Sequence, residues 1–387
     1  AEGGFRVNFA RLMQRKREVV DTLVQGVEHL MASKRIRVLA GRGRIVRPGL
    51  VEVTGANGRE ELASRAIIIA TGSVPARLPI PGADLPGVLV SDDIFELETL
   101  PKSLVVVGAS VVGIEFACLF GALGTRISVL GRKTFLREAE QQLAKRLRAM
   151  LSQRGMAITI GLEFKEIVRG DSGLLRVHYE QGGKQQYAEG ELVLVATGRW
   201  PYAEGSGIED LGVKMNGRAI AVNEYLETNV PGIYAVGDCI GGYMLAHVAS
   251  YEGEVAVENI LGHRRAVDYR VVPNCIFTMP EIADVGLTGQ PFALQRERAR
   301  RGDGRKRRPG AHGLRESRGR SGRQSAGRAH HGGTGQLPDR RGGPGYAPGS
   351  DGRGHRPNHS RPPHSARGAD GGGHGPIGRS HPLRAQV

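Results

Sequence analysis

The sequence predicts an α/β fold with two related strand–turn–helix units, and three observations support this prediction. Residues 66–75 and 192–201 repeat one pattern, an apolar strand followed by Ala-Thr-Gly and by a proline three residues after the glycine. Residues 103–133 follow the order strand, glycine-bearing turn, helix, strand. The run 67–70 is continuously apolar, which is typical of a parallel-sheet strand covered on both faces.

The N-terminal part predicts one long helix and several short strands. Over residues 9–33, six apolar side chains recur at helical spacing, so we expect a helix with one buried face. These side chains are Leu12, Val19, Val20, Leu23, Val27 and Leu30. Strand-like segments follow at 36–46, 50–55 and 63–75, the last of which contains the first copy of the repeat.

The central segment predicts a complete unit. We expect a small stripe on its helix, because Gly113, Ala117 and Gly121 recur every four residues and allow close packing on a sheet. Its expected elements are a strand over 104–107, a turn over 108–110, a helix over 111–123 capped by Gly124, and a strand over 127–130.

Three further segments complete the pattern. Residues 189–200 end the central unit with a buried strand and contain most of the second copy of the repeat. Residues 230–260 predict a buried strand, a Gly-Asp turn and a helix, and residues 272–289 predict strand, turn, strand.

Charge divides the chain into two parts. Of the 387 residues, 1–290 hold 33 Lys and Arg against 33 Asp and Glu, whereas 291–387 hold 21 against 6. The formal net charge of +15 therefore belongs entirely to the second part. That part is rich in Arg and Gly and has no periodic apolar face, so we expect a disordered tail.

Cysteine usage and hydropathy favour a cytoplasmic location without a membrane span. The three cysteines form no paired motif, which argues against a secreted disulfide scaffold and suits a reducing compartment. The basic start lacks the apolar stretch of a signal peptide. The longest apolar run, 104–124, contains Glu115 and several glycines and is therefore not expected to cross a membrane.

The turn at 108–113 predicts a site for a nucleotide pyrophosphate. Such a group needs backbone N–H donors at a helix N-terminus and a turn free of obstructing side chains. Gly108 and Gly113 match the first and third glycines of G-x-G-x-x-G, while Ser110 replaces the second. A merely glycine-rich turn is the alternative, and the flanking strands and helix favour the nucleotide site.

Two further places in the sequence carry candidate ligand-binding side chains. Gly131, Arg132 and Lys133 end the second strand where an NAD site would carry a carboxylate, so these cations fit the 2′-phosphate of NADP or form a solvated basic turn. Asp238 follows a buried strand, where a carboxylate either binds a polyol hydroxyl or caps a helix. Each cysteine is expected to be a small core residue.

Several motifs together resemble a known family. They are VVVGASVVGIE, the two Ala-Thr-Gly turns, GIYAVGDC, MLAHVASYEGEVAVENI and FTMPEIADVGLT. This ordered set, which covers about residues 1–290, resembles the FAD-dependent pyridine nucleotide–disulfide oxidoreductases, most closely the dihydrolipoamide dehydrogenase group. The resemblance implies two Rossmann-like dinucleotide-binding domains that bind FAD and NAD or NADP, and electron transfer between a dithiol/disulfide and the nicotinamide through the flavin.

The resemblance also assigns site residues. The residues expected to line FAD are Gly43, Thr71, Gly72, Ser73, Asp238 at the ribityl chain, and Met244, Leu245, Ala246 and His247 at the isoalloxazine. The residues expected to contact the nicotinamide nucleotide are Gly108, Ala109, Ser110, Val111, Val112, Gly113, Ile114, Glu115, Gly131, Phe164 and Gly198.

The chain departs from the family at both ends. We find no counterpart of the family's first FAD fingerprint, its redox Cys-x4-Cys pair or its catalytic His–Glu pair, so we expect an N-terminally truncated chain that is inactive alone. The tail is interpreted as a shifted reading frame that replaces the dimerisation domain. The expected domains are a partial FAD domain at 1–100, an NAD(P) domain at 101–225, a return to the FAD domain at 226–275, a dimerisation start at 276–290 and the tail at 291–387.

Alternative functions remain open at this point. Mercuric reductase and soluble transhydrogenase are alternatives within the same chemistry. In another class, the basic tail would contact nucleic-acid phosphates, although Tyr346 is the only aromatic residue after 300. The resemblance further implies a lipoyl-protein substrate and a homodimer, and the dimer is doubtful here without its interface domain.

Overall fold

The computed structural model describes residues 7–286, which lie within the first of two compact units, residues 1–309. The predicted disordered tail at 291–387 lies outside the described residues, as does the end of the segment 272–289.

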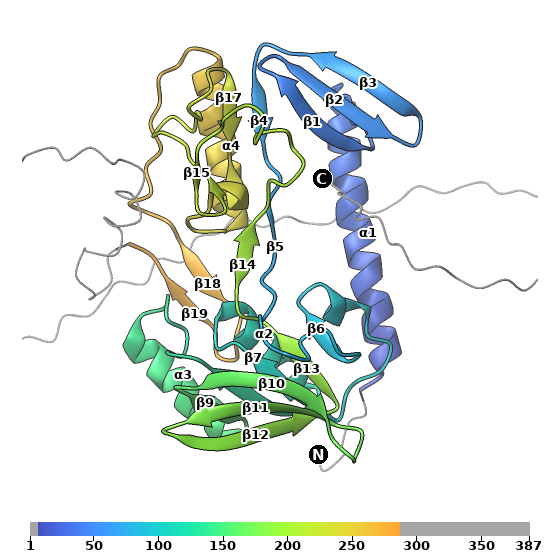
Figure 1. Ribbon diagram of the computed structural model, residues 1–387, viewed down its shortest axis with the longest axis vertical. Coiled ribbons are helices and arrows are strands. Elements are labelled where there is room, and N and C mark those ends of the chain that lie inside the picture. Colours follow the sequence, from blue (N-terminus) through green and yellow to red (C-terminus); the bar gives the residue numbers. More distant parts are fainter. Residues whose placement is uncertain (1–6, 287–387) are drawn as a thin grey trace, which may run out of the picture. The chain divides into compact units, whose positions relative to one another are not determined.

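Four α-helices and two short 3-10 helices occur within residues 7–286 (Figure 1). They are α1 (Phe9–Ser33), η1 (Asp93–Glu96), α2 (Val111–Ala122), α3 (Gln141–Gln153), η2 (Gly237–Ile240) and α4 (Ala246–Ile260). Helices α1, α2 and α4 confirm the three predicted helices. Helix α3 was not predicted; the side chain of Glu140 caps its first turn by accepting two backbone N–H groups.

The central sheet is parallel and has the order β6-β13-β7-β8-β9. Its strands are β6 (Val88–Val90), β7 (Ser103–Val107), β8 (Arg126–Gly131), β9 (Ala157–Ile160) and β13 (Leu192–Val195). Strand order reverses between β7 and β13, and in open α/β sheets ligands bind in the crevice beyond the carboxyl ends of such strands. The predicted α/β unit at 103–133 is therefore confirmed.

The remaining strands form smaller sheets. Two are three-stranded and antiparallel: β1 (Arg42–Arg47), β2 (Leu50–Gly55) and β3 (Gly58–Ala63), and β10 (Glu163–Arg169), β11 (Leu175–Gln181) and β12 (Lys184–Gly190). The two-stranded sheets pair β4 (Ile67–Ile69) with β17 (Ile233–Ala235), β5 (Ser73–Pro75) with β14 (Arg199–Pro201), β15 (Met215–Asn216) with β16 (Ala219–Ile220), and β18 (Asn274–Ile276) with β19 (Ile282–Asp284).

Strand β7 shows how the central sheet is covered on both faces. Leu104 and Val106 belong to one apolar cluster with α2 and α3, whereas Val105 and Val107 belong to another with the β10–β12 sheet. Side chains alternate between the faces of a strand, so a continuous apolar run is required when both faces are buried. All five residues of β7 are buried.

Helix α2 packs against this sheet through its small residues. A Cβ added at Gly113 would lie 2.2 Å from the carbonyl oxygen of Gly108, and Ala117 is fully buried. A Cβ at Gly121 would approach the side chains of Met156 and Ile127. The predicted small stripe is therefore where α2 packs most closely.

The predicted buried face of α1 is wrong. Only Phe9 and Met13 are buried, and they join the cluster around α2. The six residues of the predicted stripe, Leu12, Val19, Val20, Leu23, Val27 and Leu30, are between 36% and 65% exposed. Their spacing predicts the helix correctly, because periodicity reports which side chains share a face and not what covers that face.

Strand β4 differs from its prediction in one respect. It pairs in parallel with β17, as expected for a parallel sheet, and Ile67 and Ile69 are buried. Ile68, which points to the other face, is 36% exposed. The prediction that both faces are covered is therefore wrong within the described residues.

Candidate functional site

The two copies of the repeat meet in a small antiparallel ribbon. Strand β5 follows the first Ala-Thr-Gly turn, strand β14 follows the second, and they pair through Ser73↔Pro201, Val74↔Trp200 and Pro75↔Arg199. The N–H of Ala76 donates to the carbonyl of Gly198 (2.9 Å), and the N–H of Tyr202 donates to that of Gly72 (3.0 Å). The two turns, 126 residues apart in the sequence, therefore have matching surroundings.

The glycine turn after β7 lies at the point where strand order reverses. A Cβ at Gly108 would be 2.2 Å from the carbonyl oxygen of Ala196, at the end of β13, and Gly108 has a φ of +127°. Only glycine suits both demands. Ser110 follows, and its hydroxyl donates to the same carbonyl of Ala196 (2.9 Å). The turn is thereby fixed against the second copy of the repeat.

The first turn of α2 remains available to an anion. Ser110 is the N-cap residue, but its side chain makes no capping hydrogen bond, and the first turn of α2 carries no acidic residue. The positive end of the helix dipole and its backbone N–H groups therefore lack a negative partner from this helix. Val111, Val112 and Ile114, three of the residues predicted to contact the pyrophosphate, lie in the first turn of α2.

The segment that follows β8 is hydrogen-bonded to the glycine turn. The N–H of Leu136 donates to the carbonyl of Ala109 (2.8 Å), which joins the segment after β8 to the turn after β7. Gly131 is buried, whereas Arg132 and Lys133 are exposed. The structure thus brings together most of the residues predicted for the nicotinamide nucleotide.

Asp238 is held by the first copy of the repeat. It lies in η2, directly after β17, and the hydroxyl of Ser73 donates to its carboxylate (2.5 Å). Arg199 in turn donates to the hydroxyl and to the carbonyl oxygen of Ser73 (2.7 and 2.8 Å). Asp238, Ser73 and Arg199 form one hydrogen-bonded chain across the ribbon. Sequence reasoning missed Arg199, although its position matches that of Ser73 in the repeat.

A buried carboxylate supports the turn that carries Asp238. Glu252 of α4 is 4% exposed; its carboxylate accepts the N–H of Gly237 (2.7 Å) and the hydroxyl of Tyr269 (2.7 Å). Burial raises the pKa of Glu252, and the charge of Asp238 adds to this effect, while the two hydrogen bonds oppose it. Burial and the neighbouring carboxylate also raise the pKa of Tyr269.

Glu252 was also missed by sequence reasoning, although a signal was present. It lies at helical spacing from Val248, Val255 and Ala256, all of which are buried. A carboxylate on an apolar helix stripe must find hydrogen-bond donors, and the Gly-Asp turn provides one.

The segment 244–247 leads into α4. Met244 has a φ of +50°, and Leu245 is the N-cap residue of a helix without a side-chain cap. Ala246 begins the helix. The Nε2–H of His247 donates to the carbonyl of Pro273 (2.9 Å), the residue directly before strand β18.

Other predicted residues lie on separate elements. Gly43 lies on β1, where it pairs with Val53. Phe164 lies on β10 and is 8% exposed within the core beneath the central sheet, so little of its ring is accessible to a ligand. Glu115 of α2 accepts the N–H of Phe277 (2.8 Å), which gives this charge a hydrogen-bond partner.

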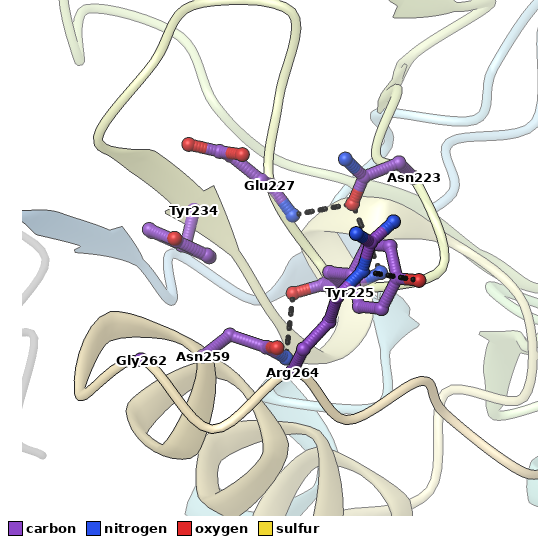
Figure 2. A pocket seen from close by; sticks show the side chains of 7 residues that line it. All are labelled: Asn223, Tyr225, Glu227, Tyr234, Asn259, Gly262 and Arg264. Carbon is purple, nitrogen blue, oxygen red and sulfur yellow. Dashed lines mark hydrogen bonds between the residues drawn. The ribbon is translucent and has the colours of Figure 1, made fainter.

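A polar hollow of about 380 Å³ lies elsewhere, beside the C-terminal end of α4 (Figure 2). Asn223 accepts the N–H groups of Tyr225 and Glu227, and Asn259 donates to the carbonyl of Tyr225. Arg264 donates to the Tyr225 hydroxyl. The polar groups of this hollow hold the surrounding loops together, and none of them belongs to the predicted sites.

The cysteines do not form a redox pair within residues 7–286. Cys118 and Cys239 are buried and free, and burial raises the pKa of each thiol. Cys275 is free and exposed, so the prediction of a small core residue is wrong at this position. In the same part of the chain, no group of His, Cys, Asp and Glu side chains could hold a metal ion. None of the described helices is both long enough and apolar enough to span a membrane.

Comparison with known proteins agrees with this geometry. The sequence model of the pyridine nucleotide-disulphide oxidoreductases matches residues 3–253. Dihydrolipoyl dehydrogenases of Bacillus subtilis and Chlamydia trachomatis are 37% and 35% identical to this chain, covering 74% and 76% of it. The chain spans 63% of the length of each of these relatives.

A solved structure is also similar. The HOCl-induced flavoprotein disulfide reductase RclA from Escherichia coli has a TM-score of 0.68 and 28% sequence identity, with 76% of this chain and 66% of that chain covered. The glycine turn, the paired repeat and the Gly-Asp turn thus occur in a chain that resembles these enzymes over most of its length. The chain belongs to the pyridine nucleotide-disulphide oxidoreductase family.

Proposed function

We propose that this chain forms the FAD- and nicotinamide-nucleotide-binding part of a dihydrolipoyl dehydrogenase-type oxidoreductase. The observation that carries the proposal is the hydrogen bond from Ser73 to Asp238, which joins the first repeat copy to the Gly-Asp turn. When bound, FAD would relay electrons between a dithiol and the nicotinamide. Homodimerisation, a lipoyl-protein substrate and the domain limits inferred from the sequence belong to this proposal.

The residues after β7 fit a nicotinamide dinucleotide. A turn that only Gly108 can occupy brings the backbone close to the start of α2, whose N–H groups favour a pyrophosphate. Gly198 stands in the matching turn of the second copy, with a φ of +136°, and a Cβ added there would meet no atom within 4 Å.

The residues around Asp238 fit the flavin end of FAD. Ser73 and Glu252 fix the Asp238 carboxylate and the Gly237 backbone, so a polyol would meet an acceptor that is already oriented. The start of α4 at Ala246 has no side-chain cap, and its backbone N–H groups suit the electron-rich edge of an isoalloxazine. This chain's contribution is to bind and orient the two carriers.

The test is the flavin content of the purified full-length chain after incubation with FAD and desalting. We expect a flavin absorbance spectrum, and we expect Asp238→Asn to weaken FAD binding by about tenfold or more, because a charged acceptor is replaced by a neutral one. Asp171→Asn, at an exposed turn between β10 and β11, is the matched control and should bind FAD normally.

Two outcomes would count against the proposal. A folded chain that retains no flavin would overturn it. Equal FAD affinity of the wild type and Asp238→Asn would show that the Gly-Asp turn is not the flavin site.

A further inference from the structure

We infer that the polar hollow beside the C-terminal end of α4 is a binding site for a free α-amino acid with an uncharged side chain. Its volume is about 380 Å³, and its walls come from two segments, 223–234 and 259–264. Ligand pockets span roughly 300–1,000 Å³, so this hollow suits a small molecule. The residues predicted to bind FAD or the nicotinamide nucleotide are not among those that line it, so the site is separate from the proposed cofactor sites.

Hydrogen bonds between the two segments fix the walls of the hollow. Asn259, in the last turn of α4, donates to the carbonyl oxygens of Tyr225 (3.3 Å) and Arg265 (2.8 Å), and it accepts the N–H of Arg265 (3.0 Å). The side-chain oxygen of Asn223 accepts the N–H groups of Tyr225 and Glu227 (2.9 and 3.0 Å). A ligand would therefore meet walls that the chain's own contacts already hold in place, which lowers the entropic cost of binding.

Arg264 supplies a cation on one wall. Its Nε–H donates to the Tyr225 hydroxyl (2.9 Å), and its guanidinium carbon lies 4.9 Å from the centre of the Tyr225 ring. Within residues 7–286, Arg264 forms no ion pair and its two terminal nitrogens make no hydrogen bond, whereas the adjacent Arg265 pairs with Glu258 (2.8 Å). The tyrosine thus orients the guanidinium, and the terminal N–H groups stay available to a carboxylate.

Glu227 and Tyr234 supply an anion and a hydroxyl on another wall. They face each other in an isolated antiparallel bridge, so their side chains share one face. One carboxylate oxygen of Glu227 accepts the N–H of Gly232 (3.0 Å), and among the described residues this carboxylate has no ion-pair partner. Burial and the charge of Glu227 raise the pKa of Tyr234, so its phenol keeps the proton.

The hydroxyl of Tyr234 is directed at the hollow. Tyr234 is only 9% exposed, and its hydroxyl makes no hydrogen bond in the part of the chain that the structure describes. In that part, every side-chain polar atom that is fully buried has a hydrogen-bond partner. The unpartnered hydroxyl is therefore accessible, and the hollow that Tyr234 lines gives the access.

The two charges together select a zwitterion. Glu227 and Arg264 line one hollow without pairing with each other, and their charged groups lie apart in Figure 2. A simple anion would meet Arg264 but be repelled by Glu227, and a simple cation would meet the reverse. An α-amino acid satisfies both, with its carboxylate at the guanidinium and its ammonium group at the free oxygen of Glu227. The other lining side chains carry no charge, so the ligand's side chain is expected to be uncharged.

The test is equilibrium binding of three probes that share one carbon skeleton to the full-length chain at pH 7. L-Leucine carries both charges, L-leucinamide lacks the carboxylate, and 4-methylpentanoate lacks the ammonium group. Isothermal titration calorimetry measures each affinity. We expect L-leucine to bind at least about tenfold more tightly than either of the other two, because only L-leucine forms both charge-assisted contacts.

Three variants assign the contacts. Arg264→Gln should weaken L-leucine binding by about tenfold and leave L-leucinamide binding no weaker, since that probe has no carboxylate. Glu227→Gln should weaken L-leucine binding by a similar factor and leave 4-methylpentanoate binding no weaker. Tyr234→Phe removes only the hydroxyl and should weaken L-leucine binding by about two- to tenfold. Glu224→Gln is the matched control, because Glu224 is exposed on the same loop and does not line the hollow.

Several outcomes would overturn this inference. They are no binding of L-leucine by the wild type, equal binding of the three probes, and an Arg264→Gln variant that binds L-leucine as the wild type does. Arg264 is exposed, so this variant should fold even if circular dichroism shows that Glu227→Gln does not. Flavin content, measured on the same samples, tests the proposed function separately and should not change in Arg264→Gln.

Discussion

At the scale of single residues, Glu252 combines burial, two accepted hydrogen bonds and a neighbouring carboxylate. Its folded-state pKa is raised above the ordinary value of 4.5. The folded chain therefore binds more protons than the unfolded chain between these two pKa values. The free energy of unfolding contributed by this group is largest below pH 4.5 and falls as pH rises toward the folded-state pKa.

Glu252→Gln removes this titration and should remove that component of the pH dependence. We expect the stability of the wild type relative to the variant to be greatest at acidic pH and to shrink as pH rises. Denaturant unfolding over a series of pH values measures the difference. Glu254→Gln, an exposed neighbour on α4, is the control, and an identical slope in both variants would contradict the assigned role.

Two helical glycines make a second matched pair at this scale. An added Cβ at Gly113 meets the carbonyl of Gly108 at 2.2 Å, whereas one at Gly253 meets no atom within 4 Å. We expect Gly113→Ala to lower the free energy of unfolding by about 1–3 kcal/mol and Gly253→Ala to raise it by about 0.4–1 kcal/mol. Thermal or denaturant unfolding measures both. Similar effects of the two changes would refute the close approach of α2.

Residue types and spacing predicted some of these contacts and not others. Gly108 and Gly113 were predictable, because a positive φ and a close backbone approach restrict a position to glycine. The partners of Arg199 and Glu252 were not predicted: the repeat and the apolar stripe of α4 marked the two positions, but a sequence pattern does not show which hydrogen bonds such a side chain makes. Phe164 stays a predicted ligand contact, and its burial in the core cluster of the β10–β12 sheet was not foreseen.

At the scale of elements, α1 shows how little periodicity says about burial. Its first two turns pack through Phe9 and Met13 on the aromatic rings of α2, with Phe9 6.5 Å from Phe120 between ring centroids. Further along α1, Lys16 donates to the carbonyl of Phe95 (2.7 Å). Beyond this point, five apolar side chains are exposed to solvent, namely Val19, Val20, Leu23, Val27 and Leu30.

A pair of substitutions tests this division of α1. Met13→Ala should lower the free energy of unfolding by about 2–5 kcal/mol, because it removes buried side-chain volume. Leu23→Ala, at a residue that is 65% exposed, should change it by no more than about 0.5 kcal/mol. Denaturant unfolding distinguishes the two. A cost at Leu23 as large as that at Met13 would show that the apolar face of α1 is covered in solution.

The β10–β12 sheet is the largest element group that the sequence prediction left out. Its middle strand alternates buried Leu175, Val177 and Tyr179 with less buried residues, which is the period-two pattern of a half-covered strand. An alternating pattern of only seven residues also occurs in loops and helices, so it does not by itself identify a strand. The partner strands must be known before it predicts a sheet. Buried parallel strands, with their continuous apolar runs, were easier to identify.

At the scale of the whole molecule, charge is distributed unevenly along the sequence. The residues before 291 are balanced in charge, and all the described elements lie among them. The repeated Ala-Thr-Gly pattern predicted two related units, and the strands that follow its two copies, β5 and β14, pair with each other. Within residues 7–286, the apolar stripe of α1 and Ile68 of β4 are exposed. Their apolar pattern predicted burial, because a sequence pattern does not show which element covers a face.

The ribbon of β5 and β14 has a symmetry of its own. The first residue of each strand pairs with the last residue of the other, and the two central residues, Val74 and Trp200, pair with each other. Thr71 donates to the carbonyl of Tyr202, and its counterpart Thr197 donates to that of Ala76 (3.4 Å). This is an isologous contact, the kind by which two identical subunits associate about a dyad. Here both halves of the contact belong to one polypeptide, so the dyad lies within the chain.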